Sequence, residues 1–214
     1  MDANIIQNLN PALQLMVAMS LFTLLPFAFT CMTSFLRYVI VFSLLKQAMG
    51  TQQVPPAIVL VGLSVILTIY TMAPVFEQMY AMGSVPYKQN GSIVEAIAEG
   101  SKPLKEHMMK NTREKDLEFF ISLQNKERLN SPEEVTLWQI APAYIISELK
   151  TGFEIGFIIF VPFLVLDLIV ANVLLALGMM MLSPTIISLP FKILIFIAVD
   201  GWSLVVQGMV KSFN

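Results

Sequence analysis

Two charged side chains inside the longest apolar part of this chain are the first candidates for chemistry. Between residues 155 and 199 only Asp167 and Lys192 are charged, and each lies about ten residues from the turn at 178–184. Charges in apolar helices are costly unless they are paired or face a polar cavity. Two antiparallel helices joined at that turn would bring both side chains to similar depth. We therefore expect a structural Asp167–Lys192 ion pair, within one chain or across a subunit interface, with a proton path as the alternative.

Three further charges, Arg37, Glu154 and Asp200, also lie in otherwise apolar segments, and we interpret them as structural charges too. An aspartyl protease dyad of Asp167 and Asp200 is disfavoured, because Lys192 nearby favours an ion pair over a shared proton.

The chain has few residues that could bind a metal ion or form a disulfide. His107 is the single histidine and Cys31 the single cysteine, so neither a two-histidine metal motif nor a disulfide framework can form within the chain. No glycine-rich nucleotide-binding pattern occurs. The sequence thus predicts no catalytic residue, no metal site, no cofactor and no enzymatic activity.

The turn at 178–184 contains three consecutive methionines, Met179, Met180 and Met181, where a water-facing turn normally carries polar residues. One interpretation is plain packing or lipid contact. The other is a pore constriction, because methionine is flexible enough to close around irregular shapes and an apolar constriction can block water and ions by dewetting. One chain contributes one such turn, so a ring would require an oligomer.

Composition places the chain among membrane proteins or large apolar assemblies. Of its 214 residues 56% are hydrophobic and only 13% are charged, against about 25% charged in soluble domains. The net charge of −2 provides no basic surface for nucleic acid. The N-terminal residues lack the positive region of a cleavable signal peptide, so we expect none of ordinary form.

The hydropathy pattern predicts an all-α protein of the integral-membrane type, because apolar runs of about 20 residues span a bilayer as helices. We expect a first hydrophobic hairpin at 1–82, turning at 47–56, and a second at 137–214, turning at 178–184. Between them, 83–136 forms a charged amphipathic insert of short helices. Interior prolines break or kink helices, and we expect such breaks at Pro26, Pro74, Pro162, Pro184 and Pro190, with one last helix from Thr185 to Lys211.

Lysine and arginine near the first turn, at Lys46 and Arg37, favour a cytoplasmic position for that turn, with the N-terminus and the insert outside. The methionine turn should then be cytoplasmic as well, although it carries no lysine or arginine. Either that orientation is wrong or the turn does not project into bulk water.

Several segments resemble the FliP/SctR family of core export-gate proteins of the bacterial type III secretion system. The resemblance covers nearly the whole chain and rests on Pro55-Pro56, Met72-Ala73-Pro74, the segment from Ser147 to Phe157, Pro162-Phe163-Leu164 with Asp167-Leu168, the segment from Ala176 to Met181, the segment from Ser188 to Lys192, and Asp200-Gly201-Trp202.

What this resemblance implies is a subunit of a protein-conducting gate in the bacterial inner membrane, in a flagellar basal body or injectisome base. Members assemble side by side in a helical oligomeric ring, a pentamer with a small hairpin subunit (FliQ/SctS type) and one larger subunit (FliR/SctT type). They work with FlhB/SctU-type and FlhA/SctV-type proteins. Unfolded proteins pass through the central pore, and the triplet matching Met179, Met180 and Met181 forms its gasket. The assembled gate lies largely on the periplasmic side, as does the insert.

The branch of the family stays open at the level of sequence. The segment from Lys110 to Leu117 looks flagellar, whereas Gln52-Gln53-Val54-Pro55-Pro56 and the missing signal peptide look like the injectisome branch. We favour flagellar biosynthesis, with an injectisome export subunit as the alternative. A non-transporting membrane scaffold and an ion or proton channel are the alternatives from other classes.

Overall fold

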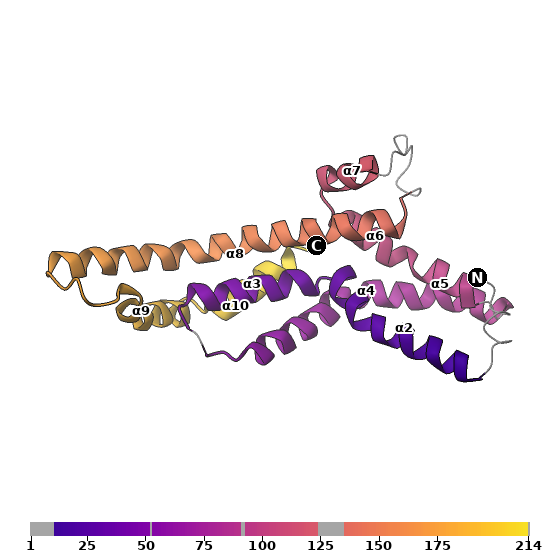
Figure 1. The fold of residues 1–214 in the computed structure, drawn as a ribbon, viewed down its shortest axis with the longest axis horizontal. Helices are drawn as coiled ribbons and strands as arrows, with labels where there is room; N and C mark the ends of the chain where they lie inside the picture. The colour runs from indigo at the N-terminus through magenta and orange to yellow at the C-terminus, as the bar shows by residue number, and fades with distance from the viewer. Residues whose placement is uncertain (1–10, 52, 91–92, 124–134, 214) are drawn as a thin grey trace. The chain divides into compact units, whose positions relative to one another are not determined.

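The computed structural model describes residues 11–51, 53–90, 93–123 and 135–213, and every regular element among them is a helix. The all-α class predicted from the sequence is therefore confirmed. With the labels of Figure 1, the helices are α2 (Pro11–Met32), α3 (Phe35–Ala48), α4 (Ala57–Asn90), α5 (Ile93–Gly100), α6 (Lys102–Lys110), α7 (Glu114–Leu123), α8 (Leu137–Ala176), α9 (Pro184–Ala198) and α10 (Gly201–Lys211).

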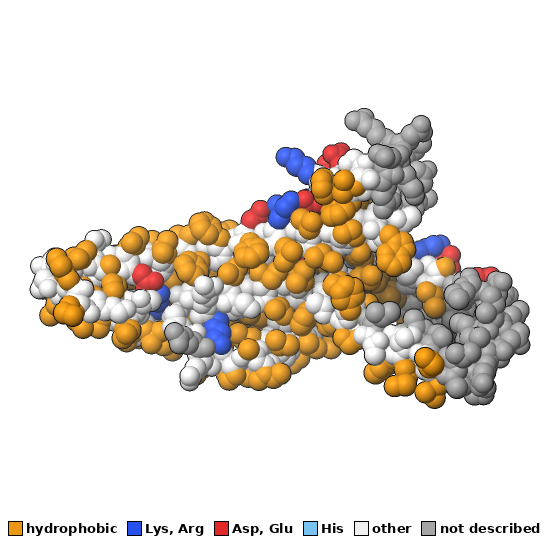
Figure 2. All heavy atoms as spheres, in the orientation of Figure 1, with side chains coloured by type: hydrophobic (Ala, Val, Ile, Leu, Met, Phe, Trp, Pro, Cys, Tyr) orange, Lys and Arg blue, Asp and Glu red, His pale blue; other side chains and the backbone are white. Residues whose placement is uncertain are grey.

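In the described part of the chain two helices, α4 over Ala57–Lys88 and α8, are long and apolar enough to cross a membrane. Up to four spans result if two further helix pairs, each bent at a short break, are counted as one span each. Only 22% of the most apolar window of α4 and 11% of that of α8 is buried. Figure 2 shows hydrophobic side chains, in orange, along much of the visible surface of α8. Most of this apolar surface is thus left for contacts outside the chain.

The helices continue through most of the prolines at which we expected breaks, and this corrects the expectation. Pro26 lies inside α2, Pro74 inside α4, Pro162 inside α8 and Pro190 inside α9. A proline removes one intrahelical hydrogen bond, but helices of the membrane type tolerate this because neighbouring helices, hydroxyl side chains and local adjustments of the helix can satisfy the freed carbonyl. Only Pro184 stands at a helix boundary, in the first turn of α9.

The predicted last helix is in fact two helices, α9 and α10, bent by 64° at Val199–Asp200. Asp200 has a positive φ of 52°, a left-handed conformation that ends regular helix and that aspartate tolerates better than most residues. A Cβ on Gly201 would collide with the Phe196 ring, so the missing side chain lets the start of α10 lie against the end of α9 at this bend.

The chain forms two compact units that interleave distant segments, residues 1–36 with 68–148 and residues 37–67 with 149–214. The sequence-based division into hairpin, insert and hairpin stays a prediction.

The first unit contains a small core and one close helix contact. Its core is formed by Met108, Val135, Ile140 and Tyr144. Gly83 and Gly100 let α4 and α5 approach so closely that a Cβ on Gly83 would lie 2.9 Å from a backbone oxygen of α5. The short helices α5 and α6 therefore pack on the long helices α4 and α8, although Ile97 of α5 is 66% exposed.

The second unit carries the larger core and a glycine pair that sets its geometry. Tyr38, Val41, Phe42 and Leu45 of α3 are fully buried against residues of α8, α9 and α10. On α8, Gly152 and Gly156 face Ile40 and Leu44 of α3, one helical turn apart on each helix. Small residues at this spacing let two helices pack backbone to side chain, which is a common contact in membrane proteins.

Candidate functional site: a methionine turn and the ion pair behind it

The turn between α8 and α9 begins with a defined helix cap. Gly178 has φ of 73°, the Gly178 amide donates to the Leu175 carbonyl at 3.0 Å, and the Met179 amide donates to the Leu174 carbonyl at 2.9 Å. This pair of bonds with a left-handed glycine is a Schellman motif, which closes the carbonyl end of a helix. Glycine is favoured there because other residues pay for a positive φ.

The other end of the turn is set by Ser183 and Pro184. Ser183 is extended, with φ of −72° and ψ of 118°, and Pro184 follows at the start of α9. Proline suits this position, because its ring fixes a helical φ and its missing N–H has no partner in a first turn anyway. Both ends of the methionine segment are therefore fixed by residues with strong backbone preferences.

The three methionines themselves project away from the chain. Met179 is 48% exposed, Met180 79% and Met181 101%, and the turn is seen at the left end of α8 in Figure 1. Leu182 beside them is 47% exposed. Contiguous exposed apolar groups mark a contact surface. The turn therefore offers flexible apolar side chains for contact with another molecule.

Asp167 and Lys192 form an ion pair within one chain, with 2.7 Å between Asp167 Oδ2 and Lys192 Nζ. This is the contact that the sequence predicts. The Ser188 hydroxyl donates to the other carboxylate oxygen, Oδ1. Lys192 is 3% exposed and Asp167 27% at their side chains, so the pair lies at the edge of the core. At 1.5 Å per helical residue the pair stands about 15 Å behind the methionine turn.

Lys192 also reaches a third helix, because its ammonium donates to the Ala48 carbonyl at 3.2 Å. Ala48 is the last residue of α3, where carbonyl groups lack helical partners and the helix dipole favours a cation. Gly50, with φ of 73°, follows that end, and a Cβ there would lie 3.9 Å from Lys192 Nζ. One lysine thus ties α9 to α8 and to the end of α3.

Arg37 plays a similar part at the end of α10. Its Nη1 donates to the Ser212 carbonyl at 3.1 Å and to the Ser212 hydroxyl at 2.9 Å. Its guanidinium carbon lies 3.7 Å from the centre of the Phe213 ring, a cation–π geometry. Arg37 is only 3% exposed, so both buried cations of this unit hold the carbonyl end of a helix.

The remaining predicted charges are not brought to the ion pair. Glu154 lies on an exposed part of α8, and Asp200 is exposed in the bend before α10. Among the described residues, no group of three or more His, Cys, Asp or Glu side chains is arranged to hold a metal ion.

Sequence reasoning missed the uncharged partners of the pair. Ser188 is fully buried and lies one helical turn before Lys192, so its spacing could have indicated a shared face. The Ala48 carbonyl has no signature in the side-chain pattern and could not have been found.

The fold and site define a helical protein with membrane-length apolar helices, buried cations at helix ends and an exposed methionine turn. Residues 18–209 match the model of a protein family described as the "FliP family". With this match covering most of the chain, the protein belongs to the FliP family.

Three relatives, each called "Flagellar biosynthetic protein FliP", show how far the similarity extends. That of Bacillus subtilis (strain 168) is 43% identical over 208 residues, covering 97% of this chain and 94% of that protein. That of Pectobacterium carotovorum is 45% identical over 203 residues, covering 94% and 79%. That of Buchnera aphidicola subsp. Baizongia pistaciae is 48% identical over 202 residues, covering 94% of this chain but 56% of that protein. The chain therefore spans only about half the length of the Buchnera relative.

Proposed function

We propose that this chain is a component of the flagellar export apparatus, where it is one subunit of a protein-conducting gate closed by its methionine turn. Membership of the FliP family and the flagellar names of its relatives support the apparatus. The observation that carries the gate is the exposure of Met179, Met180 and Met181 in the turn that joins α8 to α9.

The gate requires several copies, because each chain contributes one turn. The apolar surfaces of α4 and α8, largely uncovered within the chain, support assembly side by side, and a homopentamer is the expected ring. Around a central axis the turns would form a collar of unbranched side chains that yields to an unfolded polypeptide and closes again. When closed, such a collar excludes water and ions by dewetting.

The ion pair behind the turn gives the collar a fixed support. Asp167, Ser188 and Lys192 join α8 to α9, and Lys192 joins both to α3. We propose a structural role for this cluster, as for Arg37, Glu154 and Asp200. A proton path is disfavoured, because the ammonium already neutralises the carboxylate and donates to a backbone carbonyl.

The gate would contain other subunits and would lie in the inner membrane. The other subunits are the small hairpin (FliQ-type) and the single larger protein (FliR-type), with FlhB-type and FlhA-type proteins at the apparatus. The location is the bacterial inner membrane at the flagellar basal body, with the assembled gate and the segment 83–136 on the periplasmic side. Unfolded flagellar proteins are the cargo.

Replacing Met179, Met180 and Met181 together with alanine tests the gasket. Shorter side chains should leave the resting gate open to water, so ion leakage through the assembled complex in a planar bilayer should rise while export of flagellar substrates persists. A triple leucine variant should keep the seal. Replacing Met16 and Met19, which are 66% and 62% exposed on α2, with alanine is the control and should not leak.

Leakage equal to that of the unmodified complex would refute the gasket. Loss of export without leakage would favour a scaffold whose turn only packs. Restoration of motility to a strain lacking its own FliP tests the flagellar branch, and failure there with restoration of effector secretion in an injectisome strain would favour the alternative.

A further inference from the structure

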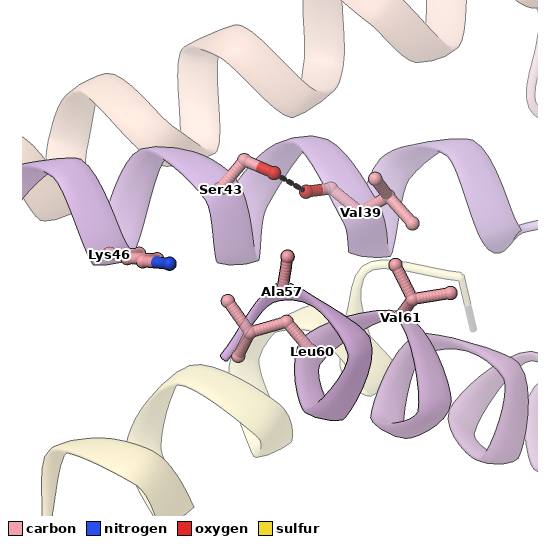
Figure 3. Close-up of a pocket in the computed structure, with 6 residues that line it drawn as sticks. All are labelled: Val39, Ser43, Lys46, Ala57, Leu60 and Val61. Carbon is pink, nitrogen blue, oxygen red and sulfur yellow. Dashed lines mark hydrogen bonds between the residues drawn. The ribbon is translucent and has the colours of Figure 1, made fainter. Parts of the chain in front are cut away.

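Two adjoining cavities surround Lys46, near the end of α3. The first, of about 240 Å³, lies between α3 and the start of α4 and is lined by Val39, Ser43, Lys46, Ala57, Leu60 and Val61. The second, of about 400 Å³, shares Ser43 and Lys46 and adds Gln47, Gly50, Thr51 and Thr185. Figure 3 shows Ala57 and Val61 pointing toward α3, with the Lys46 nitrogen at one end of the space between the helices. We call the two cavities together the Lys46 groove.

The Lys46 groove joins an apolar part to a polar part. The first cavity is lined by aliphatic residues except for Lys46 and Ser43, and the Ser43 hydroxyl already donates to the Val39 carbonyl at 2.7 Å. The second is lined mostly by polar residues, because Gln47, Thr51 and Thr185 share its wall with Ser43 and the same lysine. A ligand that fills both parts must carry a hydrocarbon portion next to a hydrogen-bonding, negatively charged portion.

The Lys46 ammonium is the group in the groove that would attract a negatively charged ligand. Within the described part of the chain no carboxylate pairs with it, whereas Lys192 has Asp167 at 2.7 Å. Lys46 is only partly exposed, so its charge lies in the wall of the groove.

The position of the groove fixes the class of ligand. Ala57, which lines it, is the first residue of the apolar span Ala57–Lys88. Lipid headgroups lie where an apolar span begins, and lysine side chains reach that level. The first turn of α4 also directs partly positive amides toward this end. A phosphate at this level would therefore meet the Lys46 ammonium with its acyl chains alongside α4.

We propose that the Lys46 groove binds an anionic phospholipid, with the phosphodiester on Lys46 and an acyl chain against Val39, Leu60 and Val61. A soluble phosphate ester lacks the hydrocarbon for the apolar part, and a zwitterionic lipid carries a cation of its own that offsets the attraction. The lipid would join the end of α3 to the start of α4, between which the described residues 49–51 and 53–56 form no helix or strand. This proposal does not depend on the export function.

The test uses the purified full chain in a non-ionic detergent, titrated with short-chain phosphatidylglycerol or phosphatidylcholine, with bound lipid counted by native mass spectrometry. The unmodified chain should prefer phosphatidylglycerol. Lys46→Gln should weaken phosphatidylglycerol binding about fivefold, the factor expected for one cation near an anionic lipid surface, whereas Lys46→Arg should retain it. Lys211→Gln, at the exposed end of α10, is the matched control and should change nothing.

A second variant tests the apolar part. Ala57→Phe should fill the space beside Leu60 and lower the binding of both lipids while leaving the helix content unchanged. Equal binding of the two lipids, or equal effects of Lys46→Gln and Lys211→Gln, overturns the proposal. So does displacement of phosphatidylglycerol by soluble glycerol 3-phosphate at matched concentration, since the ligand would then be a phosphate ester alone. A loss of oligomer in Lys46→Gln with unchanged lipid preference would instead identify a second copy as the occupant.

Discussion

At the scale of single residues, two buried cations hold helix ends together in the second unit. Lys192 and Arg37 each use a helix carbonyl end as a partner, and Lys192 adds a carboxylate at 2.7 Å. Burying an ion costs several kcal/mol unless its attraction and hydrogen bonds offset the loss of water. The two positions where α3 and α10 end are therefore specified by polar contacts as well as by packing.

Replacing Lys192 with methionine should lower the free energy of unfolding by about 3 kcal/mol, the low end for removing one partner of a buried pair. The low end applies because 27% of the Asp167 side chain remains exposed. The measurement is unfolding in a detergent–SDS titration followed by circular dichroism. Lys211→Met, at the exposed end of α10, is the control and should change stability by less than about 0.5 kcal/mol.

The charge swap separates the ion pair from the helix cap. Asp167→Lys combined with Lys192→Asp should regain part of what each single change loses, because the pair is restored while no donor reaches the Ala48 carbonyl. A double variant no more stable than the weaker single variant would show that the pair adds nothing. The pair itself could be predicted from sequence, since both charges are isolated in apolar helices at similar spacing from one turn, but its backbone partner could not.

At the scale of elements, hydropathy was sufficient to predict the long helices, and local residue preferences were not sufficient to predict their breaks. α4 and α8 follow from their apolar runs. Prolines 26, 74, 162 and 190 suggested breaks, but the helices continue through them, because other groups can satisfy the single carbonyl that a proline frees in a membrane-type helix. The bend between α9 and α10 instead falls at Asp200-Gly201, a turn-forming dipeptide that hydropathy obscured.

The contact of α3 with α8 depends on Gly156 more than on Gly152. A Cβ on Gly156 would lie 2.2 Å from Leu44 Cδ1 and 2.9 Å from Leu44 Cβ, whereas one on Gly152 would lie no closer than 3.1 Å to any atom of Ile40, with Ile40 Cβ at 3.2 Å. Gly156→Ala should therefore destabilise the chain by about 1–2 kcal/mol, an overpacking cost partly offset by the better helix propensity of alanine. Gly152→Ala is the matched control and should be nearly neutral.

Shortening the opposing side chain provides the check on this mechanism. Leu44→Ala removes Cδ1 and Cγ of Leu44, which would lie 2.2 and 3.1 Å from the new Cβ, and keeps only Leu44 Cβ at 2.9 Å. Gly156→Ala should therefore cost less stability in the Leu44→Ala background than in the unmodified chain, a favourable coupling in a double-mutant cycle measured by the same SDS titration. Additive effects of the two changes would mean that the helices do not meet at Gly156. The result concerns packing within the second unit and is independent of the proposed function.

At the scale of the whole molecule, a single chain leaves much of its apolar surface uncovered. Large apolar side chains such as Phe157, Ile158 and Leu168 of α8 are more than half exposed, and a helix that is apolar on several sides needs lipid or other subunits around it. The sequence predicted this state from its 56% hydrophobic content. What surrounds the helices depends on other molecules, so neither the sequence nor the fold of one chain specifies it.

A cysteine placed in the methionine turn should report whether turns of different copies meet. Cys31 is the single cysteine, so Cys31→Ser gives a background in which Met180→Cys is the only thiol. If copies form a ring with their turns at its axis, mild oxidation of the assembled complex should produce covalent dimers in high yield, because each thiol has a neighbour and can bond to one. Ile58→Cys, on α4 and 76% exposed, is the control for random collision.

Assembly must be measured on the same sample, because a failed cross-link is informative only in an oligomer. Size-exclusion chromatography with light scattering gives the number of copies before oxidation. An intact oligomer that cross-links no better at Met180 than at Ile58 would place the turns away from one another and would remove the geometric basis of the gasket. Efficient cross-linking at Met180 would show that the methionine turns of neighbouring copies meet, as the proposed gasket requires.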